Sequence, residues 1–310
     1  MTDTMPLAGI HCTHNPGHRE FIPFKELGEN NLPLPYNTSD WVECIKLLGH
    51  DTVRLSVCST STSRPPQDAS LQQVAGTATV RYGSGTAFLM SMAQWSSNPS
   101  TWACKIITAA HVVFDDSEAK NTVVEFFYDD EEDSRLHVIR ARGTRVLRVD
   151  VAGNRCAFEC ITHAAGLLPK LVACKNARNA VVTKLARIHS TLGHLTNRPD
   201  LVVVISHPHG KAKHVSVGHL VNMPTDGTIR FVLGGSGVAR QQRVMACLVE
   251  YTAATCPGSG GGSVSVLGRD HHVTVAFAPH SATGQKHNLS GMGWTARIDD
   301  CDHLTLTREQ

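Results

Sequence analysis

The stretch WACKIITAAHVV, residues 102–113, is the most informative part of the sequence for the fold and the function of this chain. Its first seven residues are mostly apolar or β-branched, which predicts a strand. The strand ends in Thr-Ala-Ala-His, so the imidazole of His111 lies at a strand-to-helix corner braced by two small alanines. Alone, His111 could be a structural histidine satisfied by its neighbours. A second strand, GSGTAF at residues 83–88, precedes it and favours a functional role.

An acid followed at once by an apolar strand begins a second stretch, DLVVVISHPHG at residues 200–210. A carboxylate beside a buried strand costs free energy unless a partner compensates its charge. We therefore expect the carboxylate of Asp200 to have a partner; the alternative is an aspartate that caps a turn. Asp150 is a second candidate for the same role, but the flanking sequence pattern is missing there.

The third stretch is a glycine-rich loop, TCPGSGGGSV at residues 255–264. Together the three stretches resemble the chymotrypsin-fold serine proteases, and residues 200–218 resemble the intracellular high-temperature-requirement proteases. The chain order His, Asp, Ser is also that of the chymotrypsin-like enzymes. The resemblance covers roughly residues 74–298.

This resemblance implies a serine endopeptidase that works through a catalytic triad and an acyl-enzyme. His111 would relay the proton, Asp200 would orient His111, and Ser259 would attack the scissile carbonyl. The backbone N–H groups of the nucleophile loop, which contains Gly258, Gly260 and Gly261, would bind the oxyanion. The implied substrate is a peptide or protein, and no metal or other cofactor is implied.

The nucleophile loop departs from the family pattern Gly-x-Ser-Gly-Gly-Pro-Val. Without a gap, Gly258 is the first glycine, and Gly260 stands where the nucleophile should be. A shift by one residue makes Ser259 the nucleophile, but it places Pro257, which has no N–H, where the family supplies an oxyanion donor.

The two registers have different consequences for activity. Loss of one oxyanion donor costs about 10²–10³ in kcat, whereas loss of the serine costs about 10⁶. The first register therefore predicts a weak serine endopeptidase. The second predicts an inactive pseudoprotease that binds peptide or protein in the retained cleft, and the sequence leaves both open.

The substrate pocket is also implied by the resemblance. In the family its floor lies about six residues before the nucleophile, here Ala253 or Ala254, so a preference for Lys or Arg is not expected. Its wall should come from residues 275–281, which include Phe277 and His280. A histidine there resembles that of glutamyl endopeptidases and picornaviral main proteases, which use it to hold Glu or Gln. The alternative is a histidine in a surface turn.

The pattern of short strands predicts an all-β fold with two six-stranded antiparallel barrels of the chymotrypsin type. We expect an N-terminal extension over 1–73, the protease domain over 74–298 with a helical insertion at about 115–198, and a C-terminal tail over 299–310. Helices are predicted over 40–49, capped by Asp40, and within 156–195, where Val181, Leu185, Ile188 and Leu192 share one face.

The composition and the net charge bear on binding to nucleic acid or membranes and on secretion. The chain has 310 residues and a formal net charge of +2, which gives no electrostatic argument for binding nucleic acid or an anionic membrane. No export signal is visible and the ten cysteines are scattered, so we expect reduced thiols in the cytoplasm or nucleus rather than secretion. The oligomeric state is left open.

Two groups of cysteine and histidine residues are candidates for metal sites. Cys156, Cys160 and His163 form one, with Cys174 further along, and Cys12, His14 and His18 form the other. Neither has a familiar ligand spacing, so both are interpreted as buried or incidental residues and no metal is predicted.

Overall fold

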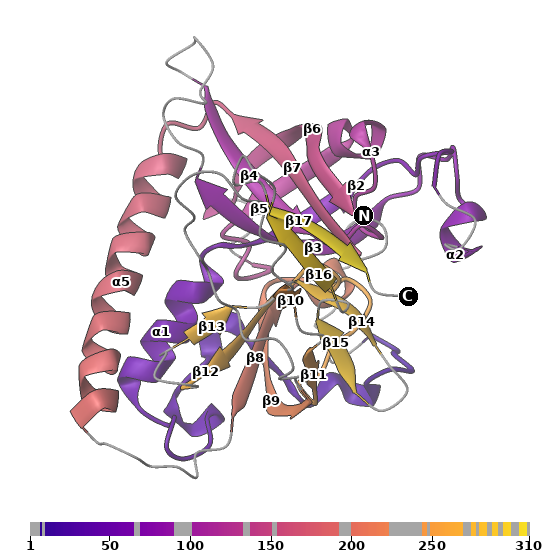
Figure 1. Cartoon of the computed structure of the whole chain (residues 1–310). Coiled ribbons are helices and arrows are strands. Elements are labelled where there is room, and N and C mark those ends of the chain that lie inside the picture. Colours follow the sequence, from indigo (N-terminus) through magenta and orange to yellow (C-terminus); the bar gives the residue numbers. More distant parts are fainter. Residues whose placement is uncertain are drawn as a thin grey trace.

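Six antiparallel strands close a barrel in the first half of the chain, in the order β2-β3-β4-β7-β6-β5 (Figure 1). The strands are β2 (Thr52–Val57), β3 (Arg81–Leu89), β4 (Trp102–Thr108), β5 (Thr122–Phe126), β6 (Ile139–Asp150) and β7 (Arg155–Thr162). Every second side chain points inward along β7, where Cys156, Phe158 and Cys160 are buried. This period of two is that of a strand with one face in a core.

The computed structural model describes residues 7, 10–64, 69–89, 101–132, 137–150, 154–191, 200–222, 244–246, 249–268, 274–276, 279–283, 287–290, 294–298 and 304–308. In this part of the chain, no helix combines the length and the apolar character that crossing a membrane requires.

An eight-stranded antiparallel sheet forms the second half, in the order β13-β12-β8-β9-β11-β15-β14, with β1 also paired to β9. Its strands are β1 (Phe21–Pro23), β8 (Leu201–Ser206), β9 (His214–Asn222), β11 (Val249–Tyr251), β12 (Ser263–Leu267), β13 (Thr274–Ala276), β14 (His280–Thr283) and β15 (Asn288–Ser290). A separate sheet joins β10 (Val244–Ala246), β16 (Trp294–Ile298) and β17 (Leu304–Arg308). The predicted all-β fold is confirmed, although this second sheet is not closed within the described residues.

Helix α5 (Leu167–Thr191) connects the two halves and runs along one side of both (Figure 1). Its first turns place Leu167 and Leu171 in the core of the barrel. Further along, Val181 and Leu185 enter the core that α1 (Ser39–Gly49) shares with the second sheet. The helix therefore buries different residues against each half.

The N-terminal region meets the rest of the molecule in several places. Thr38 occupies the N-cap position of α1 without a capping hydrogen bond from its side chain, and Asp40, the predicted cap, lies inside the helix and accepts a 2.6 Å hydrogen bond from Lys184 of α5. Short 3-10 helices precede α1: η2 (Pro16–His18), η3 (Phe24–Glu26) and η4 (Glu29–Asn31). Cys12, which precedes η2, and Phe21, at the start of β1, contribute to a small core with Ala254 and Cys256.

The structure shifts two predicted boundaries. Strand β2 lies within 1–73 and belongs to the barrel, so the barrel begins before residue 74. Most of the predicted insertion also belongs to the barrel, because β5, β6 and β7 complete it. Among the described residues between 115 and 191, helix is found in the short α3 (Asp116–Lys120), at His137 and in α5. The predicted strand over 228–233 lies outside the described residues.

Candidate active site

His111 lies at the end of β4, as the sequence predicts. The chain turns there because Ala109 accepts hydrogen bonds from the N–H groups of Val112 and Val113. Both alanines of the corner are buried. Val112 packs against Gly83 of β3 so closely that a Cβ on Gly83 would overlap its side chain. The glycine in the GSG sequence thus allows the histidine corner to approach the barrel wall.

A buried cluster of ion pairs lies against this corner and holds its backbone in place. Glu118 of α3 receives hydrogen bonds from Arg64 at 2.7 and 2.6 Å, and Arg81 lies 3.2 Å from the same carboxylate. The side chains of Arg64 and Glu118 have no exposed surface. Arg64 also donates to the backbone carbonyl of His111 at 3.1 Å. The charges are therefore paired, as burial requires, and they fix the backbone of the histidine.

Asn154 takes the position next to His111 that the sequence analysis gave to an aspartate. Its Oδ1 lies 3.0 Å from the backbone nitrogen and 3.0 Å from Nδ1 of His111. Its Nδ2 donates to the carbonyl of Ser281 at 2.7 Å. Because Oδ1 only accepts, Nδ1 of His111 carries the hydrogen of this contact. A neutral amide sets this tautomer but does not stabilise an imidazolium as a carboxylate does.

Asp200 is not brought to His111. It precedes β8, whose other end, Ser206, contacts Ser259. Five further residues of extended strand place Asp200 about 17–20 Å from Ser206. Its carbonyl accepts a 3.1 Å hydrogen bond from the N–H of Leu220 in β9, at the end of β8 that lies away from Ser206. Asp150, the second candidate, is paired with Arg155 in the β6–β7 ladder, next to the turn that carries Asn154.

Gly260, not Ser259, faces the imidazole of His111. A Cβ built on Gly260 would overlap Nε2 of His111 and lie 3.0 Å from its Cε1. Ser259 turns away: its Oγ receives hydrogen bonds from Ser206 Oγ at 3.0 Å and from the Cys256 N–H at 3.2 Å. The Ser259 side chain is 0% exposed, so a substrate has no access to the hydroxyl. The loop therefore has the ungapped register.

Ser84, in the GSG sequence of β3, holds the glycine loop from the opposite side. Its N–H donates to the carbonyl of Gly260 and its hydroxyl to the carbonyl of Gly258, both at 2.8 Å. The His207 N–H in turn donates to the Ser84 hydroxyl at 2.8 Å. The GSG pattern is visible in the sequence, but this role of its serine, which ties the barrel to the second sheet, is not.

The glycines of the loop are required by its backbone. Gly258 has φ 93° and Gly261 has φ 82°, which is the left-handed region that side chains disfavour. The N–H of Gly261 donates to the carbonyl of His280 at 2.9 Å. Among the residues that the structure describes, the N–H groups of Gly258 and Gly260 have no acceptor. These two groups are the donors that the ungapped register assigns to an oxyanion.

The predicted pocket residues lie beside this loop. Ala253 and Ala254 are buried, and the Ala254 carbonyl accepts a hydrogen bond from Ser216. His280, at the start of β14, is 4% exposed, and its Nδ1 lies 2.8 Å from the Tyr251 hydroxyl. Burial, with a smaller contribution from His111, lowers the pKa of His280 to about 3, so the ring is neutral at pH 7. Phe277 lies outside the described residues.

No model of a known protein family matches this chain, and no curated protein matches it in sequence. Similar solved structures include the HtrA-type protease AlgW with a tripeptide, at 12% identity and a TM-score of 0.41 over 82% of this chain and 60% of AlgW. The active form of the M. tuberculosis protease Rv3671c has 12% identity and a TM-score of 0.41, over 84% of this chain and 82% of that one. The serine endoprotease from Yersinia pestis has 13% identity and a TM-score of 0.41, over 84% and 62%. The chain thus spans less than two thirds of the AlgW and Yersinia chains.

The molecule's own features identify its fold. A closed antiparallel barrel carries a histidine at the end of β4, the β6–β7 turn supplies the group on its Nδ1, and a glycine loop before β12 reaches its Nε2 side. The sequence resemblance predicts the histidine and the glycine loop, whereas Asn154 rather than Asp200 lies at Nδ1 of His111, and Gly260 lies on its Nε2 side. The chain therefore has the fold of the chymotrypsin-like serine proteases.

Proposed function

We propose that this chain is a catalytically inactive relative of serine proteases that binds an extended peptide in the retained cleft. The observation that carries the proposal is Gly260, whose Cα occupies the position of the nucleophile in front of His111. The serine that precedes it in the loop, Ser259, has its hydroxyl buried in two hydrogen bonds. No hydroxyl is therefore presented to Nε2 by the loop.

Two separate losses argue against residual hydrolysis. Removal of a nucleophilic serine costs about 10⁶ in kcat. Replacement of the triad aspartate by asparagine costs about 10⁴ in a serine protease that is otherwise intact. Asn154 and Gly260 make both changes in this chain. A cleft that lacks both groups has binding surfaces but no chemistry for acyl transfer.

The groups that bind peptide are retained. The N–H groups of Gly258 and Gly260 would donate to a peptide carbonyl. Tyr251 contacts the Nδ1 edge of His280, so a peptide side chain would meet the Nε2 edge. A buried neutral imidazole suits the neutral amide of glutamine better than the carboxylate of glutamate, whose burial needs a positive charge. We therefore propose glutamine as the preferred side chain in this pocket.

Labelling with a fluorophosphonate probe tests the absence of catalysis. We expect no labelling of the wild type and none of Ser259→Ala. The double variant Gly260→Ser, Asn154→Asp restores both groups and should be labelled once His111 moves back from the new Cβ. Labelling of the wild type that Ser259→Ala abolishes would instead establish a serine endopeptidase with Ser259 as its nucleophile.

Binding is tested separately with fluorescent peptides that differ at one position, Gln, Glu or Ala. Fluorescence polarisation should show the tightest binding for Gln, and His280→Ala should remove most of the difference between Gln and Ala. Tyr82→Ala, which changes an exposed aromatic residue of β3, serves as the control. Equal binding of all three peptides would contradict the proposed pocket.

A further inference from the structure

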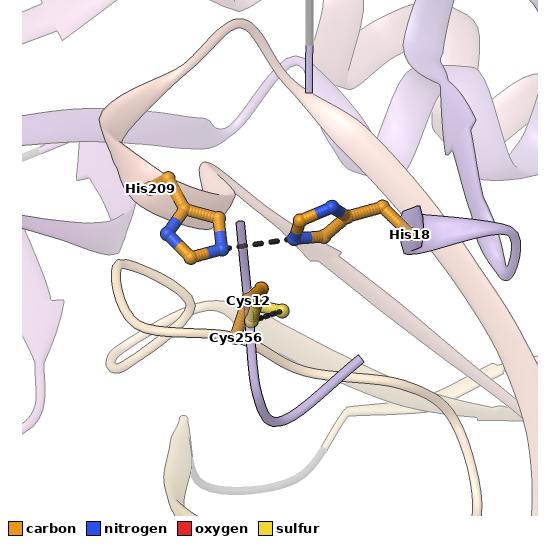
Figure 2. Close-up of side chains that lie close together, drawn as sticks. All are labelled: Cys12, His18, His209 and Cys256. Atoms are coloured by element: carbon orange, nitrogen blue, oxygen red, sulfur yellow. Dashed lines mark hydrogen bonds between the residues drawn. The ribbon is translucent and has the colours of Figure 1, made fainter. Parts of the chain in front are cut away.

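Four side chains that can bind a metal meet behind the glycine loop. They are Cys12, His18, His209 and Cys256, and one ligand atom from each lies within 4.8 Å of the others. The two sulfurs are 3.5 Å apart and the two Nε2 atoms are 3.0 Å apart. Figure 2 shows the imidazole rings pointing toward one another beside the sulfur pair. Three of the four residues are buried, and His209 is half-buried.

Two of these distances are close to those of a tetrahedral zinc site, and the sulfur–nitrogen separations, which lie within 4.8 Å, would shorten on binding an ion. With Zn–S near 2.3 Å and Zn–N near 2.05 Å, a tetrahedron has sulfurs about 3.8 Å apart, nitrogens about 3.3 Å apart, and sulfur–nitrogen pairs about 3.6 Å apart. The S–S and N–N separations of the cluster each differ from these values by about 0.3 Å. A set of two thiolates and two imidazoles is also one of the usual donor sets for structural zinc.

The surroundings of the cluster support a ligand role. Asn15 donates to Sγ of Cys256 at 3.3 Å and to the Thr255 carbonyl at 2.6 Å. Hydrogen bonds of this kind orient metal ligands and balance the charge of a thiolate. Both histidines also have left-handed backbones, with φ 51° at His18 and 53° at His209. Such conformations are uncommon outside glycine and persist where the surrounding structure requires them.

We propose that Cys12, His18, His209 and Cys256 bind one Zn²⁺ ion. Binding replaces the two thiol protons: Zn²⁺ joins two thiolates and two neutral imidazoles, and two protons pass to solvent. No electron transfer is involved. The proposal does not depend on whether the cleft hydrolyses or only binds peptides.

The ion would link three segments that are far apart in the sequence. Cys12 and His18 belong to the N-terminal segment, His209 to η6 (Pro208–Gly210) after β8, and Cys256 to the start of the glycine loop. The N–H of His209 already donates to the Pro257 carbonyl at 2.5 Å. A metal at this point would fix the loop that carries Gly258 and Gly260. The sequence analysis predicted no metal because two of the ligands lie about 190 and 240 residues from the others, beyond any local spacing pattern.

Metal analysis of the reduced, purified full chain tests the proposal. Elemental analysis after equilibration with zinc and gel filtration should find about one zinc per chain. Cys12→Ser and His209→Gln should each reduce this to less than about a tenth. Two matched variants should keep the full content: His11→Gln, an exposed histidine in the same segment, and Cys58→Ser, a cysteine outside the cluster.

Cobalt spectroscopy of the wild type keeps the test independent of how the variants fold. Co²⁺ in this site should give the intense visible bands of tetrahedral coordination and thiolate charge transfer, and X-ray absorption should count two sulfur and two nitrogen ligands. Absence of metal from the folded, reduced wild type would overturn the proposal. So would zinc content that both ligand variants leave unchanged, or a Cys12–Cys256 disulfide in a protein that binds no metal after reduction.

Discussion

The hydroxyl of Ser259 has a structural role in the glycine loop. Its Oγ satisfies two buried donors, the Cys256 N–H and the Ser206 hydroxyl. Ser259→Ala leaves the buried N–H without an acceptor, so the free energy of unfolding should fall by about 1–3 kcal/mol. Urea denaturation measures this. Ser63→Ala, at an exposed serine, should change stability by less than about 0.5 kcal/mol. Unchanged stability of Ser259→Ala would show that the hydroxyl is not held as described.

The same loop shows which residues the sequence could identify. His111 was predictable because a strand, two small residues and a histidine are consecutive in the chain. Asn154 was not, because its role depends on the β6–β7 turn meeting the end of β4, and an amide carries no catalytic signal of its own. Asp200 was favoured by a local pattern that an ordinary buried strand also produces. The orientation of Ser259 depends on contacts with β8, which lies more than fifty residues earlier.

The packing of helix α5 against the rest of the protein can be tested by substitution. Val181 and Leu185 are buried, as the predicted helical face requires, whereas Ile188 of the same face is 41% exposed. Leu185→Ala should lower the free energy of unfolding by about 2–4 kcal/mol, because it removes buried methyl groups and leaves a cavity. Ile188→Ala should cost less than about 1 kcal/mol. Urea denaturation of both variants is the measurement, and equal losses would contradict the placement of α5.

Elements with strong local patterns were predicted well. Helix α1 (Ser39–Gly49), for example, is predicted over 40–49, nearly its observed length. Strand β7 was predicted as the start of a helix. Its alternation is built from Cys, Ala and Phe, and a helix follows a few residues later, so the period of two was not decisive over eight residues. Pairing with both β4 and β6 makes it a strand.

The arrangement of the whole molecule was accessible from the sequence only through family resemblance. Closure of the barrel depends on the pairing of β2 with β5, which lie about seventy residues apart. The position of the N-terminal segment behind the glycine loop could not be predicted either, since Cys12 and Cys256 are 244 residues apart. Local patterns define strands, whereas long-range contacts decide which strands and side chains meet.

Buried neutral histidines should make the folded state sensitive to acid. Burial, followed by the nearby charge of Lys213, lowers the pKa of His50 to about 4, and burial lowers that of His280 to about 3. In the unfolded chain both pKa values are near 6.5. Between pH 6.5 and these lower values the unfolded state binds more protons, so stability present above pH 6.5 is lost as the pH falls. At pH 5 each histidine should account for up to about 2 kcal/mol of this loss.

Urea denaturation at pH 7.5 and pH 5.0 measures the effect, and comparison with the double variant His50→Gln, His280→Gln isolates it. The wild type should lose more stability than the variant between the two pH values, because glutamine takes up no proton. Other groups, including Asp51, whose pKa burial raises, titrate in both proteins, and their contributions cancel in the comparison. Equal losses would mean that the two imidazoles titrate in the folded state as they do in the unfolded chain. A protonated His280 would also reverse the expected preference for glutamine over glutamate, so the stability and peptide-binding measurements constrain each other.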